Sequence, residues 1–279
     1  MQILSKVGKL FLASCLSLSM VACSSQKTSV EIPDTKDVQS IQDAGVLKVG
    51  VKKNVKGFGY KEDGKYTGLE VDLAKKLAED LGVEVEYTSV TPLTRQTLLE
   101  DGKIDCVLAT YTITDQRKEL FDFSPSYYTG SVSVLVDDEN IISLGDLSNR
   151  IVGVVSNSES AKQLVRAMVE QGLIDSSSFD ENNFDASTWT EGVSFHVYED
   201  YTSIDAALTA GDVDGFCTDM PILNNYKNDQ RHLIDTTFAK QPYGVATSKN
   251  SGLSKFVRKE IKAWKEDGSI DALIKSYGI

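Results

Sequence analysis

The sequence predicts an α/β protein with two lobes, each of which holds a parallel-rich sheet flanked by helices. Strand and helix patterns alternate through most of the chain, as they do in βαβ units. The alternation occurs twice, because segment 99–105 (LEDGKID) matches segment 208–214 (LTAGDVD) in its turn and strand entry. The C-terminal tail supplies one further strand and helix, which can return the chain to the first lobe.

The first repeat begins with the short apolar strand 47–51. A helix is expected over 70–81, because apolar residues recur there at helical spacing and Gly82 ends the pattern. Thr91 and Pro92 are typical of a helix cap and a first-turn proline. The expected elements alternate strand and helix over 47–51, 70–81, 83–90, 91–100 and 104–109.

The second repeat follows the same order of elements. Ser156 and Glu159 have the spacing of a capping box, so a helix is expected to begin beside them and to end at Gly172. The expected strands and helices alternate over 151–155, 161–169, 193–198, 203–210 and 213–217.

The tail decides how the two repeats are combined. Residues 242–248 are expected to form a strand, and 253–264 a helix with one apolar face. Two α/β domains in tandem, each with its own site, are the alternative. The tail favours a first lobe that is completed from both ends of the chain.

The repeat places two polar residues at equivalent strand ends. Extending the register between the repeats sets Thr110 opposite Asp219. In open α/β sheets, ligands bind beyond the carboxyl ends of the strands. We therefore expect Thr110 and Asp219 to lie at two sheet edges that face each other across a cleft.

The first 23 residues are typical of an export signal. Two lysines precede the uncharged run 10–22, which as a helix would span about 20 Å, short of a hydrocarbon core of roughly 30 Å. Segment 20–23 (MVAC) resembles a bacterial lipobox, in which Cys23 would be lipidated. A plain secretory signal is the alternative. The polar residues 24–43 are expected to form a flexible tether.

Composition excludes several classes of function. The chain has 29 basic and 41 acidic residues and a net charge of −12, so it lacks the basic stripe that binds nucleic acid. Two histidines leave little material for a histidine-ligated metal site or a Ser-His-Asp triad, and no metal or cofactor is expected. Cys106 and Cys217 lie in apolar runs and are expected to be buried free thiols, although an exported protein could pair them.

Three segments carry a family resemblance, namely 68–73 (GLEVDL), 110–117 (TYTITDQR) and 121–128 (FDFSPSYY). They resemble the signatures of family 3 extracellular solute-binding proteins, and the likeness extends over about 47–279. The resemblance implies the type II periplasmic-binding-protein fold, in which two lobes joined by two hinge strands close on a ligand. The implied lobes are 44–130 with 243–279 (lobe 1) and 131–242 (lobe 2).

The family contains the receptors of polar amino-acid ABC importers. The resemblance therefore implies a monomeric binding protein, not an enzyme, that is lipid-anchored through Cys23 to the outer face of the bacterial cell membrane. Its partners would be a free amino acid, an ABC permease and the ATPase of that permease, with no nucleic acid. Two alternatives are an exported dehydratase, which would need a carboxyl of raised pKa in the cleft, and an adhesin or sensor on the same fold.

The resemblance also implies roles for residues at the cleft. Arg117 matches the arginine that grips the ligand α-carboxylate, a contact that suits a planar guanidinium, and Thr112 and Ser158 would add contacts. Asp219 matches the carboxylate that receives the α-ammonium, and Thr110 would support it. Without the resemblance, Arg117 could be a surface ion pair and Asp219 a helix cap.

A side-chain pocket is implied by two basic residues. Lys52 and Arg95 resemble residues that meet the distal carboxylate in the acidic-amino-acid branch of the family, so glutamate, aspartate or glutamine is the expected ligand. Solvated charges at the rim are the alternative for Lys52 and Arg95. Four aromatic residues are expected in the same pocket: Phe58, Tyr60, Tyr201 and Tyr243.

Overall fold

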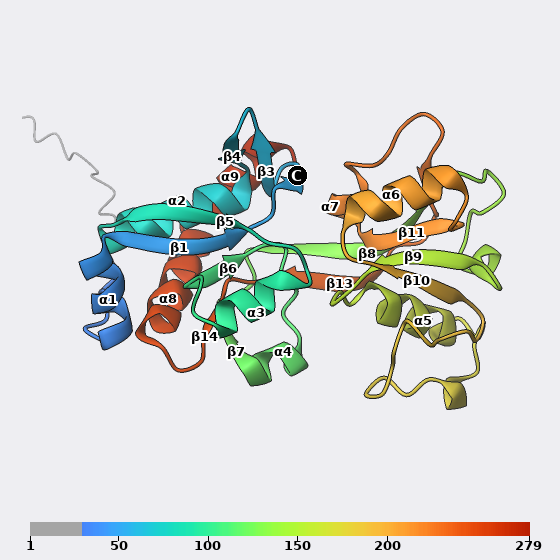
Figure 1. The fold of residues 1–279 in the computed structure, drawn as a ribbon, viewed down its shortest axis with the longest axis horizontal. Coiled ribbons are helices and arrows are strands. Elements are labelled where there is room, and N and C mark those ends of the chain that lie inside the picture. The colour runs from blue at the N-terminus through green and yellow to red at the C-terminus, as the bar shows by residue number, and fades with distance from the viewer. Residues whose placement is uncertain (1–29) are drawn as a thin grey trace, which may run out of the picture.

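The computed structural model describes residues 30–279, which form two lobes arranged along the long axis of the molecule (Figure 1). The expected signal peptide, Cys23 and the first part of the expected tether lie outside these residues. Among the described helices, none is long and apolar enough to cross a membrane.

Lobe 1 is built on a five-stranded sheet in the order β5-β1-β6-β14-β7. Strand β1 pairs in parallel with β5 and β6, whereas β14 pairs antiparallel with β6 and β7. A small sheet of β2, β3 and β4 lies beside it. The elements are α1 (Lys36–Ala44), β1 (Val46–Val51), β2 (Asn54–Val55), β3 (Gly59–Glu62), β4 (Lys65–Thr67), α2 (Leu69–Leu81), β5 (Glu84–Ser89), α3 (Thr94–Glu100), β6 (Cys106–Leu108), α4 (Asp115–Leu120), β7 (Phe121–Phe123), β14 (Ala246–Ser248), α8 (Gly252–Glu266) and α9 (Ser269–Tyr277).

Lobe 2 repeats the same parallel core. Strand β9 pairs in parallel with β10 and β11, and the long strand β8 adds antiparallel to β11. Strands β12 and β13 both pair antiparallel with β8. The elements are β8 (Tyr128–Val136), β9 (Ile151–Val155), α5 (Ser160–Glu170), β10 (Ser194–Tyr198), α6 (Tyr201–Ala210), β11 (Gly215–Asp219), α7 (Met220–Leu223), β12 (His232–Leu233) and β13 (Phe238–Tyr243), with short 3-10 turns at Gly145–Leu147 and Ser176–Ser178.

Apolar periodicity explains how the helices pack. In α2, Leu73, Leu77 and Leu81 fall on one face and are buried, as the helical spacing of apolar residues predicts. The central strands β6 and β11 are buried along their whole length, because helices cover both faces of a parallel sheet. The α/β fold class with two lobes is confirmed.

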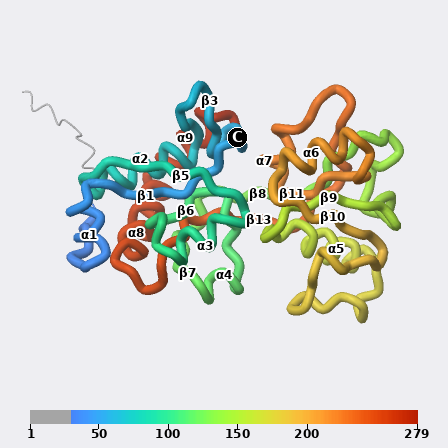
Figure 2. The backbone as a smooth tube through the Cα atoms, viewed as in Figure 1, coloured from blue at the N-terminus to red at the C-terminus, as the bar shows by residue number. Residues whose placement is uncertain are grey.

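Two antiparallel strands connect the lobes. Strands β8 and β13 run side by side between them (Figure 2), with Tyr243 opposite Tyr128 at the end of the pairing that is nearer to lobe 1. The chain leaves the lobe 1 sheet at β7 just before β8 and re-enters it at β14 just after β13. These two strands are the crossings between the lobes.

The tether prediction is wrong from residue 36 onward, because Lys36–Ala44 form helix α1. Val38 and Ile41 are buried in the core of lobe 1. Helix α1 packs on α8, and the Leu253 backbone N–H donates to Asp37 Oδ2 at 2.9 Å. The short segment is polar on average, but its two apolar residues are three apart, which places them on one helix face.

The capping-box prediction is also wrong. Helix α5 begins at Ser160, and Glu159 occupies the N-cap position without a side-chain capping bond. Asn157 has a φ of 57°, so the chain turns sharply between β9 and α5. Ser158 therefore precedes the helix, and its hydroxyl donates to the Val155 carbonyl at 2.7 Å.

Two further boundaries differ from the sequence prediction. The strand expected over 242–248 is divided into β13 and β14, which belong to different sheets because the chain crosses between lobes there. The helix expected from Thr91 begins at Thr94, although Thr91 Oγ1 still accepts a hydrogen bond from the Thr94 N–H at 3.2 Å. Cys106 and Cys217 are buried free thiols, as expected.

The turn before α2 yields a stability prediction. Gly68 has φ 121° and ψ 169°, a conformation essentially confined to glycine, and an added Cβ would lie 2.2 Å from the Phe58 carbonyl oxygen. Gly64 also has a positive φ, 80°, but an added Cβ there meets nothing within 4 Å. We expect Gly64→Ala to lower the free energy of unfolding by about 1–2 kcal/mol and Gly68→Ala by about 1–3 kcal/mol more.

Urea denaturation of the two variants and the wild-type protein measures this difference. Gly64→Ala is the control for the cost of positive φ alone. Equal midpoints and slopes for the two variants would contradict the steric argument.

Candidate functional site

A buried cavity lies between the lobes, at the carboxyl ends of the central strands. Thr110 follows β6 and Asp219 ends β11, and both line this cavity. The two residues that the sequence register sets opposite each other therefore line one cavity. The lining residues are Arg95, Thr110, Thr112 and Arg117 from lobe 1, Ser158, Glu159, Ser160, Tyr201, Thr218 and Asp219 from lobe 2, and Gln241 from β13.

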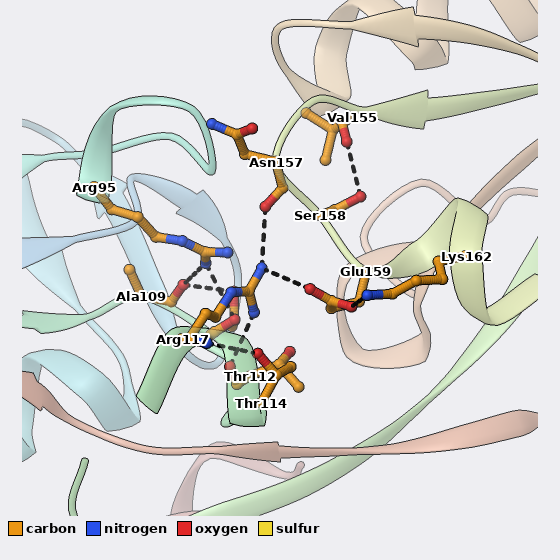
Figure 3. A network of polar contacts seen from close by, with 11 residues as sticks. Arg95, Ala109, Thr112, Thr114, Arg117, Val155, Asn157, Ser158, Glu159 and Lys162 are labelled. Atoms are coloured by element: carbon orange, nitrogen blue, oxygen red, sulfur yellow. Dashed lines mark hydrogen bonds and ion pairs between the residues drawn. The ribbon is translucent and has the colours of Figure 1, made fainter. Parts of the chain in front are cut away.

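Arg117 spans the cleft from the first turns of α4. The Thr114 hydroxyl caps this helix by accepting from the Arg117 backbone N–H at 3.2 Å. The guanidinium donates through Nη1 to the Thr112 carbonyl at 2.9 Å and through Nη2 to the Asn157 carbonyl of lobe 2 at 3.1 Å (Figure 3). Glu159 Oε1 lies 3.5 Å from Nη2. Arg117 is thus fixed at the cavity wall by contacts with both lobes.

Glu159 does not leave the cleft with a free negative charge. Its other oxygen, Oε2, lies 3.0 Å from Lys162 Nζ, so the carboxylate sits between two cations (Figure 3). Only about a tenth of the side-chain surface of Glu159 is exposed, as is that of Arg117. The pair formed by Glu159 and Lys162 is therefore close to neutral as seen from the cavity.

Asp219 is the carboxylate on the opposite wall. It is 7% exposed, and the Tyr243 hydroxyl donates to Oδ2 at 2.5 Å. Burial raises the pKa of the Asp219 carboxyl to about 6, although the hydrogen bond from Tyr243 and three nearby cations lower it. Those cations are Arg95, Arg117 and Lys52. Oδ1 of Asp219 is left for a cationic group in the cavity.

Arg95 reaches the cavity from α3 and is 4% exposed. Its Nη1 donates to the carbonyls of Ala109 and Thr110 at 2.9 and 3.3 Å. The guanidinium also lies over the Tyr111 ring, 4.0 Å from its centroid. Burial, and then the charge of Arg117, lower the pKa of Arg95 to about 10. The group therefore keeps its positive charge at neutral pH.

Lys52 follows β1 directly and does not itself line the cavity. It is 1% exposed, and Nζ stands 5.0 Å from the centroid of the Tyr201 ring of lobe 2. Burial, and then the charge of Arg95, lower the pKa of the Lys52 amine well below its usual value. Lys52 and Arg95 are thus buried in the cleft, which excludes the alternative that they are solvated rim charges.

Glu70 is a buried residue of the site region that carried no predicted role. Its Oε1 accepts from the Thr110 N–H at 2.5 Å and from the Tyr127 hydroxyl at 2.6 Å. Thr110 has a φ of 45°, so Glu70 holds a strained backbone at the cavity wall. Burial raises the pKa of the Glu70 carboxyl. The one feature of the sequence that indicated a buried Glu70 was the position of a carboxylate on a helix face that is otherwise apolar.

Buried polar atoms without hydrogen-bond partners gather at this site. Within residues 30–279, four of the five such side-chain atoms belong to residues around the cavity. They are Lys52 Nζ, Glu70 Oε2, Arg95 Nε and Gln241 Oε1. Buried polar groups normally find partners, so the cluster indicates a place for a polar ligand. Residues 30–279 contain no group of three or more His, Cys, Asp or Glu side chains that could hold a metal ion.

Several predicted ligand contacts lie away from the cavity wall. Phe58 is fully buried and packs edge-on against the Tyr128 and Tyr243 rings, at centroid distances of 4.9 and 5.9 Å. Tyr60 is half-buried on β3 in the small sheet. Tyr243 acts through Asp219 rather than lining the cavity. Roles of these residues toward a ligand side chain stay predictions.

Comparisons with known proteins agree with this architecture. The sequence profile of the bacterial extracellular solute-binding proteins, family 3, matches residues 47–279. A glutamine-binding protein of Geobacillus stearothermophilus is 31% identical over 87% of this chain and 92% of its own length. An ABC transporter glutamine-binding protein of Bacillus subtilis (strain 168) is 30% identical over 98% of this chain and 97% of its own length.

Solved structures share the two-lobed fold. An ancestral arginine-binding protein bound to arginine superimposes with a TM-score of 0.69 at 30% identity, covering 84% of this chain and 98% of that chain. The similarity therefore extends over both lobes.

The bond between Tyr243 and Asp219 generates a prediction. We expect Tyr243→Phe to raise the pKa of Asp219 above about 6, by about one to two pH units, because a hydrogen bond to the ionised carboxylate is lost. The measurement is a carboxyl-carbon NMR titration of aspartate-labelled protein. Tyr127→Phe is the matched control, since its hydroxyl bonds Glu70 instead. A pKa of Asp219 that is the same in both variants would refute the role of Tyr243.

Proposed function

The chain belongs to the bacterial extracellular solute-binding proteins, family 3, and we propose that it is the substrate-binding protein of an ABC importer for a polar amino acid. The ligand binds in the cavity between the lobes and is delivered to the membrane permease. Glutamate and aspartate fit the charges of the site best, and glutamine fits its hydrogen-bonding groups.

One observation carries the proposal: a buried guanidinium and a buried carboxylate line the same cavity, one contributed by each lobe. Arg117 and Asp219 are 8% and 7% exposed. A free amino acid carries the complementary charges on one carbon atom. Its α-carboxylate pairs with Arg117, assisted by Thr112 and Ser158, and its α-ammonium pairs with Asp219, assisted by Thr110.

The remaining charges favour an acidic side chain. Arg95 keeps its positive charge at neutral pH, because its pKa is about 10, and its buried Nε has no hydrogen-bond partner among residues 30–279. Glutamate and aspartate carry a second carboxylate that can pair with this charge. A distal carboxylate can accept a hydrogen bond from the Nε of Arg95, and the Lys52 amine lies beyond it, 5.0 Å from the Tyr201 ring centroid.

Relatives of this chain are named for different amino acids. Those compared above are named for glutamine and for arginine. A cationic side chain would be placed against the Arg95 guanidinium and the Lys52 amine in a closed, weakly screened cavity. The charges therefore favour glutamate, aspartate or glutamine over arginine and over any other cationic amino acid.

Binding fits the site better than acid catalysis does. Asp219 has the raised pKa that a dehydratase would need, about 6. One of its oxygens, however, already accepts from Tyr243, and the other is the partner that an α-ammonium requires. A carboxylate that holds the substrate ammonium is not free to protonate a leaving group.

We also propose that Cys23 carries the lipid anchor on the outer face of the cell membrane. Because α1 begins at Lys36, at most residues 24–35 would connect the lipid to the lobes. The receptor would therefore be held close to its permease rather than released into the medium.

A thermal-shift screen of the twenty amino acids tests the proposed function. We expect L-glutamate, L-aspartate or L-glutamine to raise the melting temperature, and lysine, arginine and histidine to leave it unchanged. Stabilisation by arginine alone would overturn the side-chain pocket. The absence of stabilisation by every amino acid would overturn the proposed function.

Removing the arginine that spans the cleft should abolish amino-acid binding. We expect Arg117→Leu to weaken L-glutamate binding at least about 30-fold, because the ligand carboxylate is then buried without its partner. Isothermal titration calorimetry gives the dissociation constants. Lys118→Leu is the control, since Lys118 is an exposed neighbour on α4 that pairs with Asp115. A loss below threefold would exclude Arg117 from the binding site.

Selectivity for a distal carboxylate should depend on Arg95. We expect Arg95→Met to weaken L-glutamate about 10-fold more than L-glutamine, because only glutamate loses a bond between two charged groups. Lys103→Leu removes an exposed positive charge from the same lobe and should change neither affinity. Equal losses for the two ligands would show that Arg95 does not contact the distal group.

A further inference from the structure

Gln241 is a buried polar residue of the cavity that no sequence argument singled out. It is 2% exposed and lines the cavity from the hinge strand β13. Its Nε2 donates to the Ala239 carbonyl in a long contact of 3.4 Å. Its Oε1 has no hydrogen-bond partner among residues 30–279. The side chain thus presents an unused acceptor in a buried place.

The strand register shows which end of the cavity this acceptor serves. Gln241 and Tyr243 are two residues apart and both buried, so they lie on the same face of β13, whereas Lys240 is exposed. From that face the Tyr243 hydroxyl reaches Asp219 Oδ2. Strand β13 pairs Gln241 with Gly130, where an added Cβ would stand 3.2 Å from the Tyr243 oxygen. Gln241 therefore lies on the face of β13 from which the Tyr243 hydroxyl reaches Asp219.

A neutral acceptor has one suitable use in this cavity. Arg95 and Arg117 supply donors for anionic groups of the ligand, and an amide oxygen repels such groups. A primary ammonium has three N–H donors. Asp219 Oδ1 can take one of them, and Thr110 Oγ1, which donates its own proton to the Ala109 carbonyl, can take a second. Among the described residues that line the cavity, Gln241 Oε1 is the buried acceptor without a hydrogen-bond partner, and it can take the third.

We propose that Gln241 is a ligand-binding residue whose Oε1 accepts the third hydrogen bond of the α-ammonium. The inference rests on the proposed function but not on which amino acid is bound, because the ammonium is common to all of them. The ammonium is then held by lobe 1, by lobe 2 and by the hinge strand together. Ligands that lack the ammonium lose all three bonds.

A purely structural role is the competing explanation. Ala239 has a φ of 48° at an irregularity in the pairing of β13 with β8, and the Gln241 amide bonds its carbonyl. Gln241 could therefore support this bulge alone. Such a role would affect thermal stability and would weaken every ligand equally.

Calorimetry with L-glutamate and its des-amino analogue glutarate separates the two roles. We expect Gln241→Leu to weaken L-glutamate about 10- to 100-fold and to change glutarate binding less than threefold. Lys240→Leu, on the opposite face of the same strand, should change neither. Gln241→Met, which is unbranched, replaces Gln241→Leu if that variant does not fold, and a thermal melt checks each variant.

Two results would overturn the inference: L-glutamate affinity within twofold of wild type, or equal losses for L-glutamate and glutarate. If L-glutamine is the amino acid that the wild-type protein binds, glutaramate replaces glutarate in the same comparison. Failure of the wild-type protein to bind any amino acid would overturn the proposed function itself, and is thereby distinguished from failure at Gln241.

Discussion

The burial of ionisable side chains where the lobes meet is the constraint on which the site depends. Lys52, Arg95 and Arg117 are no more than 8% exposed, and two carboxylates, Glu70 and Asp219, lie among them. A charge withdrawn from water needs a partner in the low-dielectric interior. In the function proposed above, a carboxylate of the ligand supplies that partner for Arg95. A cationic ligand side chain would instead face the Arg95 guanidinium, so the same burial that favours one class of ligand disfavours another.

The fold and the polar ends of the cavity followed from the sequence because they depend on periodicity. Alternating strand and helix patterns are local, and the internal repeat relates one lobe to the other without knowledge of their packing. The register set Thr110 opposite Asp219, and these residues do line one cavity. Arg117 could be assigned through a motif, since its place in the first turns of α4 is fixed by the Thr114 cap. Such features survive small errors in element boundaries.

Other parts of the site depend on tertiary packing that no local pattern encodes. Phe58 was expected to contact the side chain of the ligand, yet its ring packs against Tyr128 and is not part of the cavity wall. Glu70 could not be recognised as a support of Thr110, because the two are 40 residues apart and meet only when α2 packs beside β6. Gln241 reads as an ordinary strand residue. Its burial is caused by the crossing of the chain between lobes, which also divides the expected strand into β13 and β14.

Tyr243 of strand β13 connects the two lobes beside the cavity. Its hydroxyl bonds Asp219 of lobe 2, while its carbonyl accepts from the Tyr127 N–H at 3.0 Å and its backbone bridges to Thr112 of lobe 1. Burial alone raises the pKa of Asp219, so closing the cleft over an ionised carboxylate has a cost that a nearby cation removes. The Arg117 guanidinium imposes the opposite condition, since it shares the nearby carboxylate of Glu159 with Lys162 and can pair with a further anion. In the proposed function, the two side chains are therefore best balanced when both charges arrive together, a short distance apart, and an α-amino acid carries its ammonium and carboxylate in that arrangement.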